Sequence, residues 1–297
     1  MIIITEHSEE MYAPSVGVKR QVHEAALKLD IQTYSIPFNW VRETDATAAL
    51  SHIPHQKLPT PGFINGFGHV PEEYEELYLA CKDKNIILPN TPDEYTRIMT
   101  FDKAYPCLQG ITPETYFVES VEDIRKVLNH LTFPIFAKGN ISSRKERGWS
   151  ACVANNPSEL TELVSELLDI YYVSMGKVAL RQLIPLRTSG NTRSGFPKGR
   201  EYRIVLYQDQ PMGWGYYWSS SDALTPLNPT EETAVLSLAI EASKRLHVPL
   251  VSVDIAQDVE GKWWVLEPGD PQCAGFGHID VPKMLRSLQK ALHRKET

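Results

Sequence analysis

The 297-residue chain has no run of about 18 apolar residues free of charge, which a helix needs to cross a bilayer. Its apolar start, residues 2–4, is too short for a signal peptide. The four cysteines are scattered, without a C-x-x-C pair, and no histidine cluster has zinc spacing. We therefore expect a cytoplasmic protein with free thiols and no membrane partner.

Several sequence patterns of common chemistries are also missing. The chain has neither the G-x-x-x-x-G-K-[ST] loop nor the G-x-G-x-x-G loop, which bind phosphates in other folds. No Ser/His/Asp or Cys/His arrangement indicates a nucleophilic triad. The formal net charge of -7 disfavours nonspecific binding of polyanions over the whole surface. A hydrophobic content of 42% predicts a globular protein with a large core.

The first 90 residues alternate apolar strands with amphipathic helices. This order predicts a small α/β domain with a mainly parallel sheet. The expected elements are strand 2–4, helix 16–29, strands 31–36 and 62–67, helix 71–84 and strand 86–88.

The rest of the chain follows a different pattern. Thr91, Ser120, Asn156 and Asn228 each begin a helix signature, in which proline or acidic residues follow an N-cap residue. Between these helices, strands in immediate succession predict antiparallel sheets, so we place a domain boundary near residue 90. The expected strands are 134–138, 178–184, 202–207, 212–217, 250–256 and 263–267.

Two acidic residues stand in neighbouring apolar strands near the C-terminus. Asp254 lies within one strand, and Glu267 ends the next strand after a tight turn. A hairpin across that turn brings the two carboxylates opposite each other, where unpaired charges are costly. Converging carboxylates are typical ligands of a hard cation such as Mg²⁺. The alternative is that these carboxylates bond to backbone groups or to an arginine.

A lysine and a polar loop follow another buried strand. Lys138 ends the strand, and a segment rich in serine, basic residues and glycine comes next, at 139–149. Such a loop presents N–H groups and hydroxyls to phosphate oxygens, and the lysine adds a positive charge. Lys103 lies early in a helical segment, and residues 182–184 offer backbone groups to an adenine edge. The structural alternatives are solvated lysines and a core strand.

Taken in order, these segments resemble the ATP-grasp superfamily. The resemblance spans roughly residues 88–277 and is carried by LPNTPDEYTRIMTFDK, FPIFAKG, LRQLIPL, REYRIVLY, VSVDIA and WVLEPGDPQCAGFG. It implies an α/β pre-ATP-grasp domain, residues 1–90, and an α+β ATP-grasp domain, residues 91–297. The latter would comprise a central subdomain, 91–176, and a C-terminal subdomain, 177–297, which clamp the nucleotide between them.

The resemblance also implies roles for individual residues. ATP and Mg²⁺ are the implied cofactors, and Lys138 and Arg203 the implied catalytic residues. Gly269 stands where typical members have a metal-binding asparagine, and Asp270 lies next to it, which gives an atypical Glu-x-Gly-Asp motif. The implied metal ligands are therefore Asp254, Glu267 and Asp270. The implied ATP-binding residues are Lys103, Lys138, Ser142, Ser143, Gly148, Trp149, Gln182, Leu183 and Ile184.

The sequence leaves several functions open. The resemblance implies a ligase that activates a carboxylate as an acyl phosphate and couples it to an amine or similar nucleophile. Arg187, Arg193 and Arg200, in a polar loop between two strands, can bind an anionic acceptor. One alternative is phosphoryl or nucleotidyl transfer to a hydroxyl or an RNA end, and another is a non-catalytic nucleotide-binding protein. We expect a small-molecule or peptide substrate before RNA, and family habit suggests a homodimer.

Overall fold

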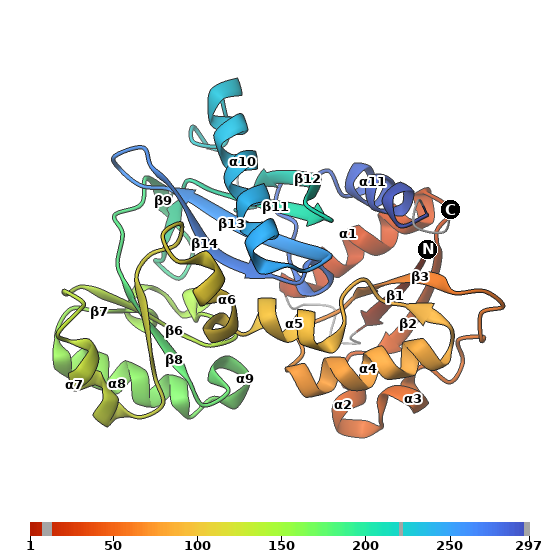
Figure 1. Cartoon of the computed structure of the whole chain (residues 1–297), viewed down its shortest axis with the longest axis horizontal. Helices are drawn as coiled ribbons and strands as arrows, with labels where there is room; N and C mark the ends of the chain where they lie inside the picture. The colour runs from red at the N-terminus through yellow and green to blue at the C-terminus, as the bar shows by residue number, and fades with distance from the viewer. Residues whose placement is uncertain (8–13, 220–221, 294–297) are drawn as a thin grey trace.

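The computed structural model describes residues 1–7, 14–219 and 222–293, which form three four-stranded sheets and one two-stranded sheet (Figure 1). The N-terminal sheet has the strand order β2-β1-β3-β4, and all its strand pairs are parallel, as predicted. The elements of this unit are β1 (Ile2–His7), α1 (Pro14–Lys28), β2 (Gln32–Pro37), α2 (Trp40–Glu43), α3 (Ala46–Ala49), β3 (Thr60–Asn65), α4 (Pro71–Asp83) and β4 (Ile86–Ile87).

Strand β1 is buried on both faces. Ile2 and Ile4 belong to the hydrophobic core on one side, with Leu77 of α4. Ile3 belongs to the core on the other side, with Val22 of α1. A parallel strand covered by helices on both faces needs apolar residues at consecutive positions, which explains the run of three isoleucines.

The second sheet is antiparallel, with the strand order β5-β8-β6-β7. The strand at 178–182, which follows the predicted division between residues 176 and 177, pairs with both neighbours in this sheet. The elements here are α5 (Pro92–Met99), α6 (Phe101–Leu108), β5 (Thr115–Val118), η1 (Val121–Asp123), α7 (Ile124–Val127), β6 (Ile135–Gly139), η2 (Lys145–Arg147), η3 (Trp149–Ala151), β7 (Val153–Ala154), α8 (Pro157–Leu168), α9 (Tyr171–Ser174) and β8 (Val178–Gln182).

The predicted helix starts are confirmed where a polar side chain caps the helix. Thr91 and Asn228 form capping boxes at α5 and at the later helix α10, and Asn156 accepts a hydrogen bond from the Glu159 backbone at α8. At Ser120 the side chain makes no cap bond, and the chain forms a single 3-10 turn before the four-residue helix α7. No described helix is long and apolar enough to cross a membrane.

The third sheet is antiparallel, with the order β12-β11-β13-β14. The helix α11, which the sequence did not predict, packs on β12 and beside α1, where Figure 1 shows blue and red helices together. The elements are β9 (Thr188–Asn191), β10 (Pro197–Gly199), β11 (Glu201–Tyr207), β12 (Gln210–Tyr216), α10 (Pro229–Leu246), β13 (Leu250–Gln257), β14 (Trp263–Gly269), η4 (Pro271–Cys273) and α11 (Val281–His293).

The two faces of this third sheet pack against different parts of the protein. Ile204 and Val253 point to the core under α10. On the opposite face, Val205 packs with α1 and α11. Glu201 and Arg203 lie farther back along β11 on that same face, because side chains alternate along a strand. The apolar half of this face therefore packs against the N-terminal unit, and the polar half contributes side chains to the candidate site.

Candidate active site

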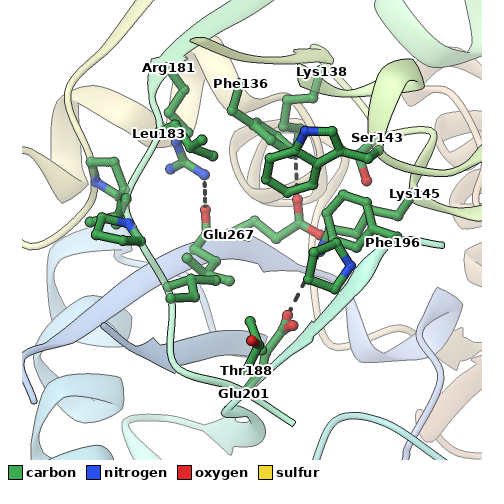
Figure 2. Close-up of a pocket in the computed structure, with 18 of the residues that line it drawn as sticks. Phe136, Lys138, Ser143, Lys145, Arg181, Leu183, Thr188, Phe196, Glu201 and Glu267 are labelled. Atoms are coloured by element: carbon green, nitrogen blue, oxygen red, sulfur yellow. Dashed lines mark hydrogen bonds and ion pairs between the residues drawn. The ribbon is translucent and has the colours of Figure 1, made fainter. Parts of the chain in front are cut away.

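A cavity of about 220 Å³ lies between the second and third sheets. One part of its wall is apolar and the other is charged, and Figure 2 shows side chains from both sheets pointing into it. The large apolar side chains of the wall are Phe136, Trp149, Leu183, Ile184, Phe196 and Trp218. The charged side chains of the wall are Lys138, Lys145, Arg181, Glu201 and Glu267.

The predicted opposition of Asp254 and Glu267 is confirmed. The two residues are directly paired across the β13–β14 hairpin. Arg203 of β11 is paired with Asp254 from the other side. Two carboxylates and one guanidinium therefore lie side by side on one face of the sheet.

Each of these carboxylates has a cationic partner. Lys138 Nζ donates to Glu267 Oε2 at 2.5 Å, across the gap between the two sheets. Arg203 binds Asp254 in a bidentate manner, with both N–O distances 2.7 Å, and also donates to the Gly275 carbonyl. Asp254 therefore binds an arginine, the alternative to metal binding that the sequence left open, and Glu267 binds a lysine.

Two further charged residues complete the cluster. Glu201 is buried, and its Oε1 makes no hydrogen bond with any described residue. The nearest cation to that oxygen is Lys145, whose Nζ lies 3.8 Å away. Sequence reasoning missed both residues individually, although Glu201 stands two positions before Arg203 and must share its face of the strand.

The field in this cluster shifts the pKa values of several groups. Burial lowers the pKa of Lys138, which is only 2% exposed, and the attraction of Glu267 opposes that effect. Burial would raise the pKa of Glu267, but Lys138 and Lys145 outweigh it and hold the pKa at about 2. Burial raises the pKa of Glu201, against the attraction of Lys145. The cluster therefore contains charged side chains that can bind an anionic ligand.

Aromatic rings contact several cations of the cluster. The Tyr217 ring contacts two of them, with its centroid 5.5 Å from Lys145 Nζ and 4.8 Å from Arg203 Cζ. The Phe101 ring similarly faces Lys138, at 5.0 Å, and Arg181, at 4.7 Å. Cation–π contacts of this kind orient charged side chains without neutralising them.

The donor set of the cluster fits Mg²⁺. This ion prefers carboxylate oxygens, and Glu201, Asp254 and Glu267 project such oxygens from one face of the sheet. The unbonded oxygen of Glu201 is the clearest sign of a missing partner. Within the described residues, no three acidic, histidine or cysteine side chains already converge to metal distance, because cations hold two of the carboxylates.

The predicted ATP-binding residues are partly gathered at the cavity. Lys138, Ser143, Trp149 and the segment 182–184 line it. The Gln182 side chain itself turns away and bonds with Thr132.

The other two predicted loop residues, Ser142 and Gly148, do not line the cavity. The backbone N–H of Ser142 bonds to the Val173 carbonyl. Gly148 has a φ of 98°, and a Cβ at this position would meet the Ser194 carbonyl at 2.5 Å. The glycine thus allows the 142–149 loop to approach the β9–β10 hairpin.

Two predicted ligands lie elsewhere. Lys103 is exposed on α6, because Phe101, Ala104 and Leu108 form the buried face of that helix and turn position 103 outward. Asp270 is 1% exposed and accepts hydrogen bonds from Asn90 and Gln272, away from the Lys138–Glu267 pair. The two carboxylates of the Glu-x-Gly-Asp motif thus have different hydrogen-bond partners.

Two of the three arginines predicted to bind substrate, Arg187 and Arg200, meet at Gln257, but none of the three lines the cavity. Arg187 and Arg193 are exposed. The Arg187 guanidinium donates to Gln257 Oε1 at 3.4 Å, and the same oxygen accepts from Arg200 at 2.6 Å. Arg200 is buried on the opposite face from Glu201 and binds Glu231 of α10 through two hydrogen bonds. Its role in the structure is to tie α10 to the sheet.

Comparisons with known proteins identify the class to which this fold and site belong. Residues 117–288 match the ATP-grasp domain of the R-2-K clade, family 3, so the chain belongs to the ATP-grasp superfamily and to that family. No curated protein matches the chain by sequence. The α/β plus ATP-grasp architecture inferred from the motifs is therefore confirmed.

Solved structures share this fold over the whole chain. D-alanine–D-alanine ligase from Bacillus anthracis, complexed with ATP, has a TM-score of 0.64 at 13% identity and covers 100% of this chain and 98% of its own. D-alanyl-alanine synthetase A from Vibrio cholerae has a TM-score of 0.64 at 10% identity, with 99% and 98% covered. The ATP-grasp ligase PsnB, complexed with a minimal precursor, has a TM-score of 0.60 at 12% identity, with 98% of both chains covered.

Proposed function

We propose that the protein is a Mg²⁺- and ATP-dependent ligase that activates a carboxylate and couples it to an amine or similar nucleophile. The observation that carries this proposal is the charged cluster between the two sheets, next to an apolar cavity. Lys138, Lys145 and Arg203 face Glu201, Asp254 and Glu267 there. Membership of a family of ATP-dependent ligases supports the same function.

The two parts of the cavity suit the two ends of ATP. Leu183 and Ile184, with the rings of Phe136 and Phe196, offer an apolar slot to the adenine base. Lys138 and Lys145 stand at the charged end, where the phosphates would lie. When bound by Glu267, Asp254 and Glu201, Mg²⁺ would neutralise phosphate charge.

The chain's own residues then provide position and charge. A substrate carboxylate oxygen attacks the γ-phosphorus, the bond to the β-phosphate oxygen breaks, and ADP leaves. The amine attacks the resulting acyl phosphate, loses a proton, and displaces inorganic phosphate. Lys138, Lys145 and Arg203 stabilise the negative charge on the transferring group, and no protein nucleophile is required.

The product distribution tests this function. The purified protein is incubated with Mg²⁺, ATP and pooled acids and amines, and the nucleotides are separated. We expect ADP and phosphate in amounts that depend on the added acid and amine. AMP and pyrophosphate would instead indicate nucleotidyl transfer, and tight ATP binding without turnover would indicate a non-catalytic protein.

A variant of one acidic residue tests the site. Glu267→Gln keeps the size of the side chain but removes the charge that pairs with Lys138. We expect the loss of turnover by roughly a hundredfold or more, since Glu267 would hold the Mg²⁺ that neutralises phosphate charge, with the fold retained by circular dichroism. Unchanged turnover in this variant would contradict the assignment.

A further inference from the structure

A buried lysine of the N-terminal unit has no partner among the described residues. Lys19 of α1 is 6% exposed, and its Nζ makes no hydrogen bond. The Phe67 ring centroid lies 5.7 Å from Nζ and is the contact that the ammonium does make. One helical turn later, His23 Nδ1 is also buried without a hydrogen bond. Two unsatisfied nitrogen atoms therefore stand on one face of α1.

The carboxylates near Lys19 are already engaged. Glu6 accepts hydrogen bonds from Trp40 at 2.8 Å, from His69 at 2.6 Å and from the Phe67 backbone at 2.6 Å. The second carboxylate near Lys19 also has its own donors. Asp270 accepts from Asn90 and from Gln272, as described above. Neither acid bonds to Lys19, so the ammonium has negative charges nearby without a direct partner among the described residues.

The position of Lys19 in the fold is one where ligands bind. Its carbonyl accepts a hydrogen bond from Asn65, the last residue of β3, which also bonds Thr5 of β1. Lys19 therefore lies at the carboxyl ends of two adjacent parallel strands, the edge at which α/β sheets receive their ligands.

The same place adjoins the charged cluster. Burial lowers the pKa of Lys19, attraction to Glu6 opposes this, and repulsion by Arg203 adds to it. The loop after β14 connects the two positions, because it carries Cys273 and then Gly275, whose carbonyl accepts from Arg203. Lys19 is thus close enough to the Arg203 end of the cluster to interact with it electrostatically.

We propose that Lys19 binds a carboxylate of the acid substrate, a role that rests on the ligase function proposed above. An uncompensated buried ammonium destabilises the unliganded protein, and an anion that enters the site removes that cost. A carboxylate fits better than a phosphate, because the nearby Glu6 and Asp270 would repel a doubly charged group.

Lys19→Met tests this site, and Lys28→Met, an exposed lysine of the same helix, serves as the matched control. Methionine keeps the length of the side chain without its charge. In the absence of added carboxylate, we expect Lys19→Met to unfold at a higher temperature than the wild type, and Lys28→Met to match the wild type. A lower midpoint for Lys19→Met would make the lysine a structural residue and would overturn the proposal.

Acetate is the ligand probe. At about 0.1 M, sodium acetate should raise the unfolding midpoint of the wild type and of Lys28→Met by roughly 2 °C relative to sodium chloride of equal ionic strength. The midpoint of Lys19→Met should not respond. An equal response in all three proteins, or none in the wild type, would overturn the proposal.

A parallel titration separates this proposal from the ligase function. A non-hydrolysable ATP analogue with Mg²⁺ should raise the midpoints of the wild type and both variants equally. Failure of the analogue to stabilise any of them would contradict the nucleotide site and leave the acetate result to decide the role of Lys19.

Discussion

His69 should make the stability of the protein depend on pH between about 6.5 and 9. Its ring lies between two carboxylates, with Nε2 2.6 Å from Glu6 and Nδ1 3.2 Å from Glu73. His69 is 4% exposed. Burial alone would lower its pKa, but the hydrogen bonds to Glu6 and Glu73 outweigh burial and raise the pKa from 6.5 to about 9.

The size of the effect follows from the shift. A rise from 6.5 to about 9 corresponds to about 3 kcal/mol of unfolding free energy, since each pKa unit is worth about 1.4 kcal/mol. Below pH 6.5 the imidazole is protonated in both states, so this stabilisation is present in full. It is lost as the pH rises through about 9, because the folded protein must then release its proton as well.

Urea unfolding at several pH values measures this dependence. Between about pH 6 and about pH 10, the wild type should lose roughly 3 kcal/mol more than His69→Gln, which cannot titrate. At the low end of this range, the variant should be the less stable protein, because it leaves Glu6 buried with one charged partner fewer. Parallel curves for the two proteins would refute the assignment of a charged His69.

Two further variants test individual contacts. Tyr217→Leu should raise the KM for ATP by roughly tenfold, because Lys145 and Arg203 lose the ring that they contact, whereas Tyr217→Phe should behave as the wild type; equal kinetics for both variants would contradict this role. Arg200→Met should lower the unfolding free energy by about 2 kcal/mol, since it removes the two charged hydrogen bonds to Glu231, and should not change the KM for the acid; a raised KM would restore the arginine to the substrate site.

The hairpin that carries the acidic pair could be predicted from the sequence. Apolar residues flank Asp254 and Glu267, and the turn between the strands is short. These local features determined which residues face each other, and the observed pairing agrees. The partner of Glu267 is Lys138, which belongs to a different sheet. The sequence shows that Lys138 ends a strand, but it does not show which residue that lysine contacts.

Two side chains with predicted roles, Arg200 and Lys103, lie away from the cavity wall for different physical reasons. Side chains alternate between the two faces of a strand, so Glu201 must share a face with Arg203, and Arg200 must lie on the other face. This rule could have been applied to the sequence. No such local rule was available for Lys103. The rotation of α6 depends on which of its residues pack under the sheets, and the structure buries Phe101 there. A tertiary contact therefore decided that position.

The affinity for ATP of two lysine variants tests most directly the claim that a triphosphate lies between the two sheets. Fluorescence titration with a labelled ATP analogue and Mg²⁺ compares Lys138→Met with Lys103→Met, after thermal unfolding has shown that both are folded. We predict that Lys138→Met weakens binding by roughly 10- to 100-fold, the effect of one charged hydrogen bond, and that Lys103→Met binds as the wild type. Undiminished affinity in Lys138→Met would contradict the claim.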